Sequence, residues 1–442
     1  MEAIPGRRQA RQPAADSRVH RNARLFGTIQ TPRSLKILYL NPSGELGGSE
    51  RSLLFLMASL RAAKPNWQMQ LVAGSGGPLI DRAAELGVQA SAIDFPHSLS
   101  RLGDAGAGGP AGTQQSHLRL VGNLGRAGVP SIAYLRRLRR TLARFAPDLV
   151  HSNGFKMHVL AAWARPAGCP LIWHIRDYVS ARPLMSRLIR ANAHRCTAAI
   201  ANSTSVADDL RTVCGDNLRI HRVYNGVDLN TFSPTGAIAN LDEICAMQDA
   251  APNTTKVGLL ATMARWKGHH VFLRAVAKAS RAMPLRAYVI GAPIYQNDSS
   301  QYRIDELRRM AAELGLEKIV GFTGFIDDTA AALRALDIVV HASTQPEPFG
   351  LAIAEGMACG KPVIVSASGG ASEIVTPGVD ALAHPPGNVD ALADCIVKLA
   401  GDRSLRDRIG AAARVSAERQ FSRERVVAEM LPIYQGVASA AA

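Results

Sequence analysis

The chain has 442 residues, 47% hydrophobic and 20% charged, a length and balance that favour two soluble globular domains over one core. No apolar run approaches the ~20 residues of a membrane span, and no charged start followed by an apolar segment indicates a secretory signal. The formal net charge of +15 comes without a zinc-finger, recognition-helix or RNA-binding motif, so we expect no nucleic-acid partner. Anionic phosphate substrates or an anionic membrane surface explain the positive charge equally well.

The six cysteines lack any Cys-x-x-Cys or Cys/His spacing typical of a metal site. We therefore expect buried thiols in a reducing cytoplasm, with no metal and no bound cofactor. Peripheral association would place the protein on the inner face of the cytoplasmic membrane.

Residues 1–34 form a basic segment that carries seven arginines against only Glu2 and Asp16. Because it has no apolar period, the segment is predicted to be a disordered tail. Contact with lipid headgroups, contact with nucleic acid and no role at all remain open for it.

The first domain is predicted over residues 35–231. The apolar run Leu35–Leu40 indicates a buried parallel strand, and the turn Asn41–Glu50 then leads into a helix that begins near Arg51. Further strand-like runs are Met69–Ala73, Leu149–His151, Leu171–His174 and Ala198–Ala201. Because helical patterns alternate with these runs, we expect a doubly wound α/β sheet.

Two segments interrupt this alternation. Gly103 to Gly128 is rich in Gly, Ala and polar residues and is predicted to be a mobile surface loop. Ile132 to Phe145 is predicted to be a helix with an apolar stripe and a face of five arginines. Such a helix packs on a sheet with its charged face in water, or lies on an anionic membrane.

The second domain is predicted over residues 256–420, after an irregular linker at 232–255. Its first strand starts near Lys256, and later runs are Arg286–Ile290, Ile319–Thr323, Ile338–His341 and Pro362–Ser366. Residues 421–442 are predicted to form a last helix.

The most informative stretch begins at Glu347-Pro348-Phe349-Gly350-Leu351 and continues to Glu355. A helix that begins near Gly350 would present unpaired backbone N–H groups, which form an anion site. Glu347 would lie in the loop beside that site and Glu355 in the second turn, about 12 Å apart at ~1.5 Å per residue. This span suits two hydroxyl-bearing rings joined by a diphosphate.

The spacing Glu-x7-Glu, followed by Gly-Lys-Pro-Val-Ile at 360–364, resembles the donor site of the family-4 retaining glycosyltransferases. The resemblance extends from about Lys36 to about Tyr434. It implies the GT-B architecture, in which two Rossmann-like domains face each other across a cleft and the last helix crosses back to the first domain. It also implies that Glu347 contacts the transferred sugar and that Glu355 binds the ribose hydroxyls.

The resemblance assigns further donor-binding residues. Family members place an Arg and a Lys five positions apart on the diphosphate; Lys267 matches, but Thr262 stands where the Arg is expected, and neighbouring Arg265 is the candidate replacement. Gly47 and Gly48 are expected to face the donor phosphate and the acceptor, as glycines let the backbone approach a ligand closely.

His174 and Gly370 complete the predicted site. His174 closes a strand at the edge where open α/β sheets bind ligands, and by resemblance it faces the donor sugar; Asp177 is a weaker candidate for the acceptor. Gly369-Gly370, with Glu373 beyond, is expected on the nucleotide side or in a structural turn. The backbone amides at Gly350 and Leu351 are expected to bind phosphate.

We therefore predict a metal-independent, retaining glycosyltransferase of the hexosyltransferase type, active in polysaccharide biosynthesis. Its partners would be a nucleoside-diphosphate sugar and a hydroxyl-bearing glycan or lipid-linked glycan. Glu347, His174 and Lys267 are the predicted catalytic residues. A nucleotide-sugar epimerase of the same fold and a non-catalytic nucleotide-sugar binder remain alternatives.

Overall fold

The computed structural model describes residues 34–96, 117–293 and 300–440, without the side chains of 117–129. The predicted tail, except Ser34, and the first part of the predicted surface loop lie outside these residues. Contacts divide the chain into Met1–Ser34 and Leu35–Ala442, and all that follows concerns the second unit.

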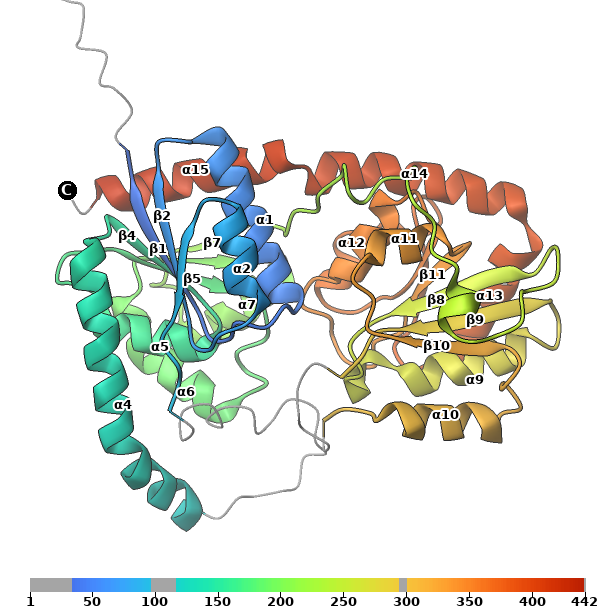
Figure 1. Ribbon diagram of the computed structural model, residues 1–442, viewed down its shortest axis with the longest axis horizontal. Coiled ribbons are helices and arrows are strands. Elements are labelled where there is room, and N and C mark those ends of the chain that lie inside the picture. The colour runs from blue at the N-terminus through green and yellow to red at the C-terminus, as the bar shows by residue number, and fades with distance from the viewer. Residues whose placement is uncertain (1–33, 97–116, 294–299, 441–442) are drawn as a thin grey trace, which may run out of the picture. The chain divides into compact units, whose positions relative to one another are not determined.

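The first sheet is formed by seven parallel strands in the order β3-β2-β1-β4-β5-β6-β7 (Figure 1). The strands are β1 (Lys36–Asn41), β2 (Gln68–Ala73), β3 (Gln89–Ala92), β4 (Leu149–Asn153), β5 (Leu171–Ile175), β6 (Ala198–Ala201) and β7 (Ile220–Arg222). The helices are α1 (Gly48–Ala63), α2 (Pro78–Glu85), α4 (His117–Phe145), α5 (Phe155–Ala164), α6 (Pro183–Asn192) and α7 (Thr204–Cys214), with the short turn η1 (Ala193–Arg195). Parallel pairing needs a crossover between strands, and these helices supply the crossovers.

The second sheet is formed by six parallel strands in the order β10-β9-β8-β11-β12-β13. The strands are β8 (Thr255–Leu260), β9 (Leu285–Ile290), β10 (Val320–Gly324), β11 (Ile338–His341), β12 (Val363–Ser366) and β13 (Leu382–His384). The helices are α8 (Leu241–Ile244), α9 (His269–Ala279), α10 (Ile304–Glu313), α11 (Thr329–Arg334), α12 (Leu351–Ala358), α13 (Val389–Gly401), α14 (Arg403–Phe421) and α15 (Arg423–Ser439), with short turns η2 (Arg265–Lys267) and η3 (Gly370–Ser372). The two sheets confirm the predicted doubly wound α/β architecture.

Three observed strands have no counterpart among the predicted ones: β3, β7 and β13. All three are edge strands: β3 and β7 form the two edges of the first sheet, and β13 forms one edge of the second. Each has only three or four residues and β3 and β7 are partly exposed, so none carries the continuous apolar run that marks a buried parallel strand.

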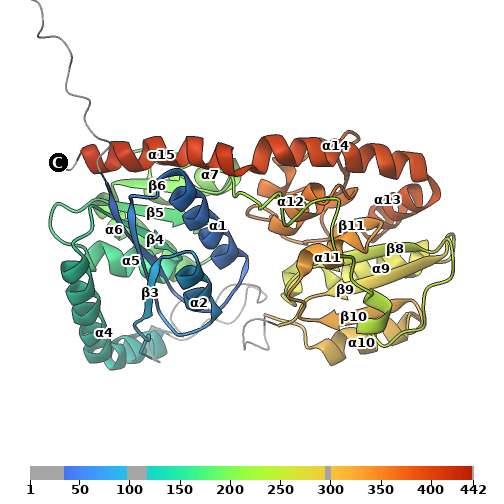
Figure 2. The same cartoon turned by 45° about the horizontal axis from the view of Figure 1, so that its top comes forward.

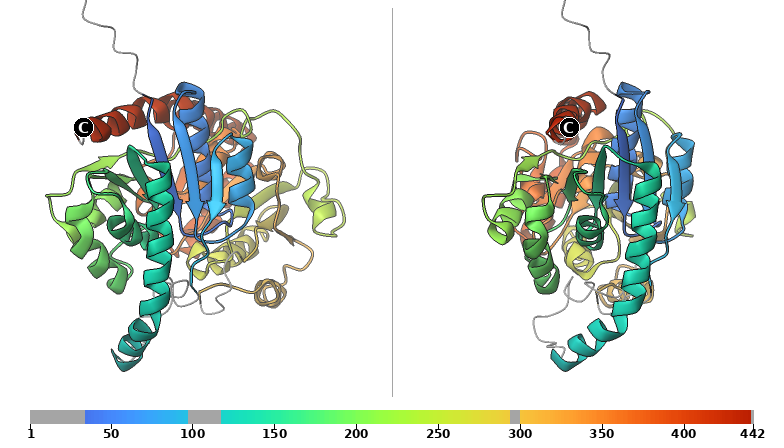
Figure 3. Two further views of the ribbon diagram at one scale, coloured as in Figure 1. Left: turned by 60° about the vertical axis from the view of Figure 1, so that its left-hand side comes forward. Right: turned by 90° about the vertical axis from the view of Figure 1, so that its left-hand side faces the viewer.

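Helix α4 corrects the predicted boundary between loop and helix. It starts at His117, so 117–128, which were expected to continue the surface loop, are helical. Its first turns extend beyond the strands of the sheet (Figure 3). Tyr134, Leu138 and Leu142 are buried, whereas the arginines of the same segment are exposed. The apolar stripe is thus used in packing on the sheet. Within the described residues, no helix has the length and apolar character needed to cross a bilayer.

The last two helices lie along one side of both sheets (Figure 2). α14 packs against α12 in the second domain, and α15 then packs against α1 and β4 in the first. Met430 and Tyr434 of α15 are buried in the same apolar cluster as Ile37 of β1, and the Tyr434 hydroxyl lies 2.7 Å from His151 Nδ1. The C-terminal helix therefore crosses back to the first domain, as predicted.

We expect Met430→Ala to lower the free energy of unfolding by about 2–5 kcal/mol, because it leaves a cavity in the core that α15 completes. Gln435→Ala, an exposed change on the same helix, is the control and should cost less than ~0.5 kcal/mol. Denaturant unfolding followed by circular dichroism measures both. Equal losses would contradict the packing of α15 into the first domain.

Candidate active site

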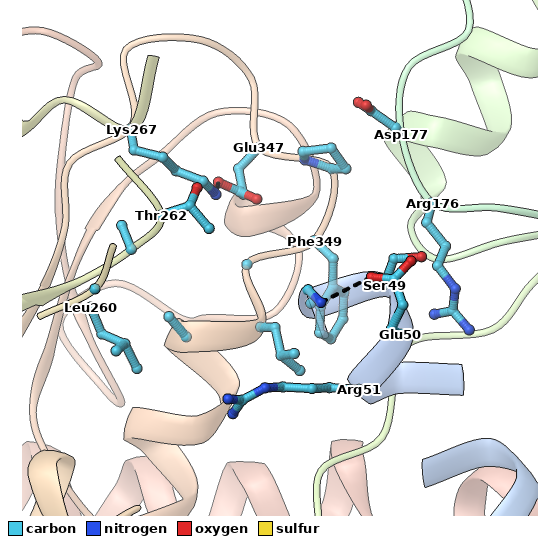
Figure 4. Close-up of a pocket in the computed structure, with 18 of the residues that line it drawn as sticks. Ser49, Glu50, Arg51, Arg176, Asp177, Leu260, Thr262, Lys267, Glu347 and Phe349 are labelled. Carbon is cyan, nitrogen blue, oxygen red and sulfur yellow. Dashed lines mark hydrogen bonds and ion pairs between the residues drawn. The ribbon is translucent and has the colours of Figure 1, made fainter. Parts of the chain in front are cut away.

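A cavity of about 530 Å³ lies at the carboxyl ends of the strands of both sheets. Its lining includes residues that follow β5, β8 and β10, namely Arg176, Thr262 and Phe325. Lys267, Thr262 and Glu347 lie on one side, and Ser49, Glu50, Arg176 and Asp177 lie on the other (Figure 4). Open α/β sheets bind ligands at this edge, so the cavity is the candidate active site.

Three helices begin at the cavity, each after a glycine: α1 after Gly47, α5 after Gly154 and α12 after Gly350. None of them has a side-chain cap, whereas α13, α14 and α15 are capped by Asn388, Asp402 and Ser422. The first N–H groups of an uncapped helix are free to bind an anion, and the helix dipole adds to the attraction.

The starts of α1 and α12 face each other across the cavity. A Cβ placed on Gly48 would meet Leu351 Cδ2 at 3.8 Å, although the two residues come from different domains. Gly350 adopts φ +93°, and a Cβ there would meet the Ile353 side chain at 2.6 Å, so this turn requires glycine. The arrangement brings together Gly47, Gly48, Gly350 and Leu351, as the predicted site requires.

Glu347 is held by three partners on a single carboxylate oxygen. Lys267 Nζ lies 2.7 Å from Oε2, Ser343 Oγ donates to it at 3.0 Å and His341 Nε2 lies at 3.1 Å. Within the described residues, Oε1 has no such partner, and it is left to receive a hydrogen bond from a ligand. Burial alone would raise the pKa of Glu347, but Lys267 and His341 hold that pKa well below its ordinary value. Glu347 is therefore an anion at neutral pH.

Glu355 lines the same cavity in the second turn of α12 and is 6% exposed. Its carboxylate has no hydrogen-bond donor among the described residues. Burial raises the pKa of Glu355 to about 7, and the positive charge of Arg51 opposes the shift. The two acids of the Glu-x7-Glu motif thus have pKa values shifted in opposite directions.

Arg265 does not replace the arginine that was expected at the position of Thr262. Thr262 lines the cavity, but Arg265 does not, because its guanidinium pairs with Glu306 at 2.9 and 3.1 Å and lies over the Tyr302 ring. This differs from the expected phosphate contact. Lys267 is the cation that the second domain brings to the cavity lining.

His174 also lies elsewhere than expected. It is inside β5, 4% exposed, with Nδ1 3.2 Å from His151 Nε2 and 3.2 Å from Arg176 Nη2. Burial and the neighbouring Arg176 charge hold the pKa of His174 well below its ordinary value. The cavity is lined instead by Arg176, the first residue after the strand.

Gly370 packs against the loop that carries Glu347 and Pro348, and it does not line the cavity. A Cβ there would stand 2.1 Å from the Pro348 carbonyl oxygen and 2.8 Å from Ser203 Cβ. Gly369 and Gly370 therefore form a tight structural turn, as in the second of the two expectations for them. Glycine is needed because the backbone after Glu347 passes so close.

Several polar cavity-lining residues were not among the predicted site residues, and they include Ser49, Glu50, Arg51 and Arg176. The helix was expected to start near Arg51, but it starts at Gly48, so this whole first turn faces the cavity. Glu50 accepts from the Gly47 N–H at 3.1 Å and holds the turn. Arg176 directly follows the carboxyl end of β5, where open α/β sheets bind ligands. The same argument that selected His174 could therefore have predicted Arg176 as a site residue.

The described residues contain no group of three or more His, Cys, Asp and Glu side chains placed to hold a metal ion.

Family models match both halves of this framework. The model for glycosyltransferase family 4 matches residues 46–231, and the model for glycosyl transferases group 1 matches 246–416. The chain belongs to the family-4 glycosyltransferases of GT-B fold, and it is a glycosyltransferase by class.

Among curated relatives, the lipopolysaccharide core biosynthesis glycosyltransferase LpsE of Rhizobium meliloti is 27% identical over 79% of this chain and 91% of its own. The D-inositol 3-phosphate glycosyltransferase of Kribbella flavida is 29% identical over 48% and 50%. Among solved structures, Anabaena Alr3699/HepE in complex with UDP has 25% identity and a TM-score of 0.72, covering 91% of this chain and 100% of its own.

We expect Glu355→Gln to stabilise the folded protein at pH 8. The stability that a raised acid pKa contributes is complete below the pKa of an unfolded Glu and is lost as pH rises through about 7. The neutral Gln avoids this loss, which amounts to roughly 3 kcal/mol at full ionisation. Denaturant unfolding at pH 5 and pH 8 measures it. A difference between variant and wild type that does not change with pH would contradict the raised pKa.

Proposed function

We propose that the protein is a retaining glycosyltransferase that moves a sugar from a nucleoside-diphosphate sugar to a hydroxyl of a glycan or lipid-linked glycan. The observation that carries the proposal is the cavity itself, which is lined by the uncapped starts of α1 and α12, by Lys267 and by two acids whose pKa values are shifted in opposite directions. HepE, whose solved complex contains UDP, and LpsE, named for lipopolysaccharide core biosynthesis, support this donor and acceptor class.

The diphosphate of the donor would lie between the starts of α1 and α12. Gly48 and Leu351, the first residues of these helices, line this space, and Lys267 adds a positive charge. Charge develops on the diphosphate as it leaves, so donors fixed in advance stabilise the transition state more than the ground state. The Glu355 carboxylate, which lines the cavity, would accept hydrogen bonds from the ribose hydroxyls.

The sugar would lie beside Glu347, whose free Oε1 accepts a hydroxyl of the ring. The bond between the anomeric carbon and the diphosphate oxygen breaks, and the acceptor oxygen bonds to that carbon on the same face. The acceptor proton passes to the departing diphosphate oxygen, so no base from the protein is required. Glu347 Oε2 is already engaged by three partners, which favours an orienting role over a covalent one.

The acceptor would enter from the first domain, where Arg176, Asp177 and Arg182 line the cavity. Arg182 pairs with Asp177 at 2.8 Å, whereas Arg176 bonds to neutral Asn153, Asn225 and His174. Among the described residues, the Arg176 guanidinium hydrogen-bonds only to neutral groups, although the Glu50 carboxyl is a nearby acid, and it would attract an anionic or hydroxyl-rich acceptor.

A non-catalytic nucleotide-sugar binder is the second candidate, because Thr262 leaves one cation fewer at the phosphate position. An epimerase would convert the donor without an acceptor. NMR of the nucleotide sugar with and without a glycan acceptor separates all three.

We further propose peripheral contact with an anionic membrane through α4. Arg136, Arg137, Arg140 and Arg144 are exposed on the helix face opposite its buried stripe, and Ile132 is 52% exposed at the same helix. Exposed arginines are attracted to anionic headgroups by about 1 kcal/mol each. A lipid-linked acceptor would then be presented close to the first domain.

We expect Lys267→Ala to lower kcat by about 100-fold or more, because one charge that stabilises the leaving diphosphate is removed. Arg265→Ala is the matched control from the same short turn and should retain near-wild-type turnover, since Glu306 holds that guanidinium away from the cavity. Initial rates of sugar transfer measure both, and circular dichroism checks the fold. Equal losses in the two variants would overturn the assignment.

We expect the triple change Arg136→Glu, Arg140→Glu and Arg144→Glu to abolish sedimentation with vesicles of 30% phosphatidylserine (about a third anionic lipid). Turnover on a soluble acceptor should persist, because these side chains lie outside the cavity. Unchanged sedimentation would refute membrane contact through α4.

A further inference from the structure

Helix α7 of the first domain is capped by a residue of the second. Ser203, directly before the helix, accepts from the Val206 N–H at 3.1 Å, which is an ordinary local cap. The first two N–H groups, of Thr204 and Ser205, instead donate to the two carboxylate oxygens of Glu373, each at 2.7 Å. We call these two contacts the interdomain cap.

The interdomain cap differs from the other helix starts. At the cavity, α1 and α12 have no side-chain cap, and α13 and α14 are capped by residues next to them in sequence. Glu373 stands 168 and 169 residues after its two partners. The Tyr224 hydroxyl adds a third bond to Oε2 at 3.1 Å. Charge-assisted bonds to a helix start are about twice as strong as neutral ones, so this contact favours the observed domain arrangement.

The turn that carries Glu373 also contacts the backbone of Glu347, in the loop before α12. The Glu347 N–H donates to the Ser368 carbonyl at 3.2 Å. The backbones of Glu347 and Gly369 also pair in an isolated parallel β-bridge. A Cβ on Gly369 would lie 2.7 Å from the Glu347 carbonyl oxygen and 2.3 Å from the Tyr178 hydroxyl. The segment from Ser368 to Glu373 is therefore bounded by Glu347 at one end and by α7 at the other.

Tyr178, in the first domain, also links the start of α7 to the backbone of Glu347. Its hydroxyl lies 2.9 Å from Ser205 Oγ and donates to the Glu347 carbonyl at 3.3 Å. The start of α7 is thus connected to this backbone both through the turn that carries Glu373 and through Tyr178. Neither Glu373 nor Tyr178 lines the cavity, so neither contacts the donor there.

We propose that Glu373 is a positioning residue, which couples the docking of the first domain to the placement of Glu347 for sugar transfer. The proposal rests on the function proposed above. When the domains meet, the interdomain cap fixes the turn, and the turn fixes the backbone of Glu347. Removing the cap leaves the cavity lining unchanged, but the hydrogen bond from Tyr178 then remains as the link between the first domain and the backbone of Glu347.

The test compares Glu373→Ala with wild type by three measurements. Hydrogen exchange of the Thr204–Ser205 amides should become at least ~10-fold faster, because their acceptor is gone. The Kd for UDP should change less than about twofold, and kcat should fall ~10-fold or more (about 1.4 kcal/mol). Glu373→Gln keeps one carbonyl acceptor, so its kcat should lie between the two.

Asp402→Ala is the matched control, since Asp402 caps α14 from within one domain by the same chemistry. It should lower the thermal midpoint without changing kcat, which separates a positioning effect from a loss of stability. Wild-type kcat in Glu373→Ala, or unchanged amide exchange, would overturn the proposal. If wild-type protein transfers no sugar, the proposed function fails as well, while fast exchange in Glu373→Ala would still establish the cap.

Discussion

A carboxylate buried at the centre of the cleft constrains everything around it. Glu347 is charged at neutral pH because Lys267, His341 and Ser343 are concentrated on one of its oxygens. Removing a partner from a buried ion pair costs several kcal/mol, so the positions of η2, β11 and the loop between β11 and α12 depend on one another. The same asymmetry leaves Oε1 available. The hydrogen bonds to Oε2 that stabilise the buried Glu347 carboxylate therefore also leave Oε1 as the atom that can bind a ligand.

Much of the fold could be predicted because its strands are buried on both faces. Runs such as Ile338–His341 are apolar throughout, and the parallel architecture follows from their alternation with helices. Edge strands such as β3 (Gln89–Ala92) are short and partly exposed, so no such run marks them. Helix starts were predictable where a turn residue stands beside an apolar pattern, as at Gly350, and imprecise at Gly48.

The cavity was partly predictable for a similar reason. Glu347, Glu355 and Lys267 lie in local patterns, and the structure brings them to one cavity. Arg265 and His174 lie elsewhere because long-range partners, Glu306 and His151, hold them, and no local spacing encodes such partners. The hydrogen bonds of Glu373 to the start of α7 could not be predicted for the same reason, because Thr204 stands 169 residues earlier in the sequence.

The return of the last helix has a consequence for biosynthesis of the chain. Ile37 in the first strand and Met430 in the last helix share one core, so the first domain is translated long before the residues that complete it. Domains generally fold in order as they emerge from the ribosome, but the first domain keeps an exposed apolar surface until α15 has also emerged. A chain interrupted late in translation would lack a complete first domain, although every residue of its cavity lining had been made. Such interrupted products are expected to be substrates for chaperones and proteases rather than partly active enzymes.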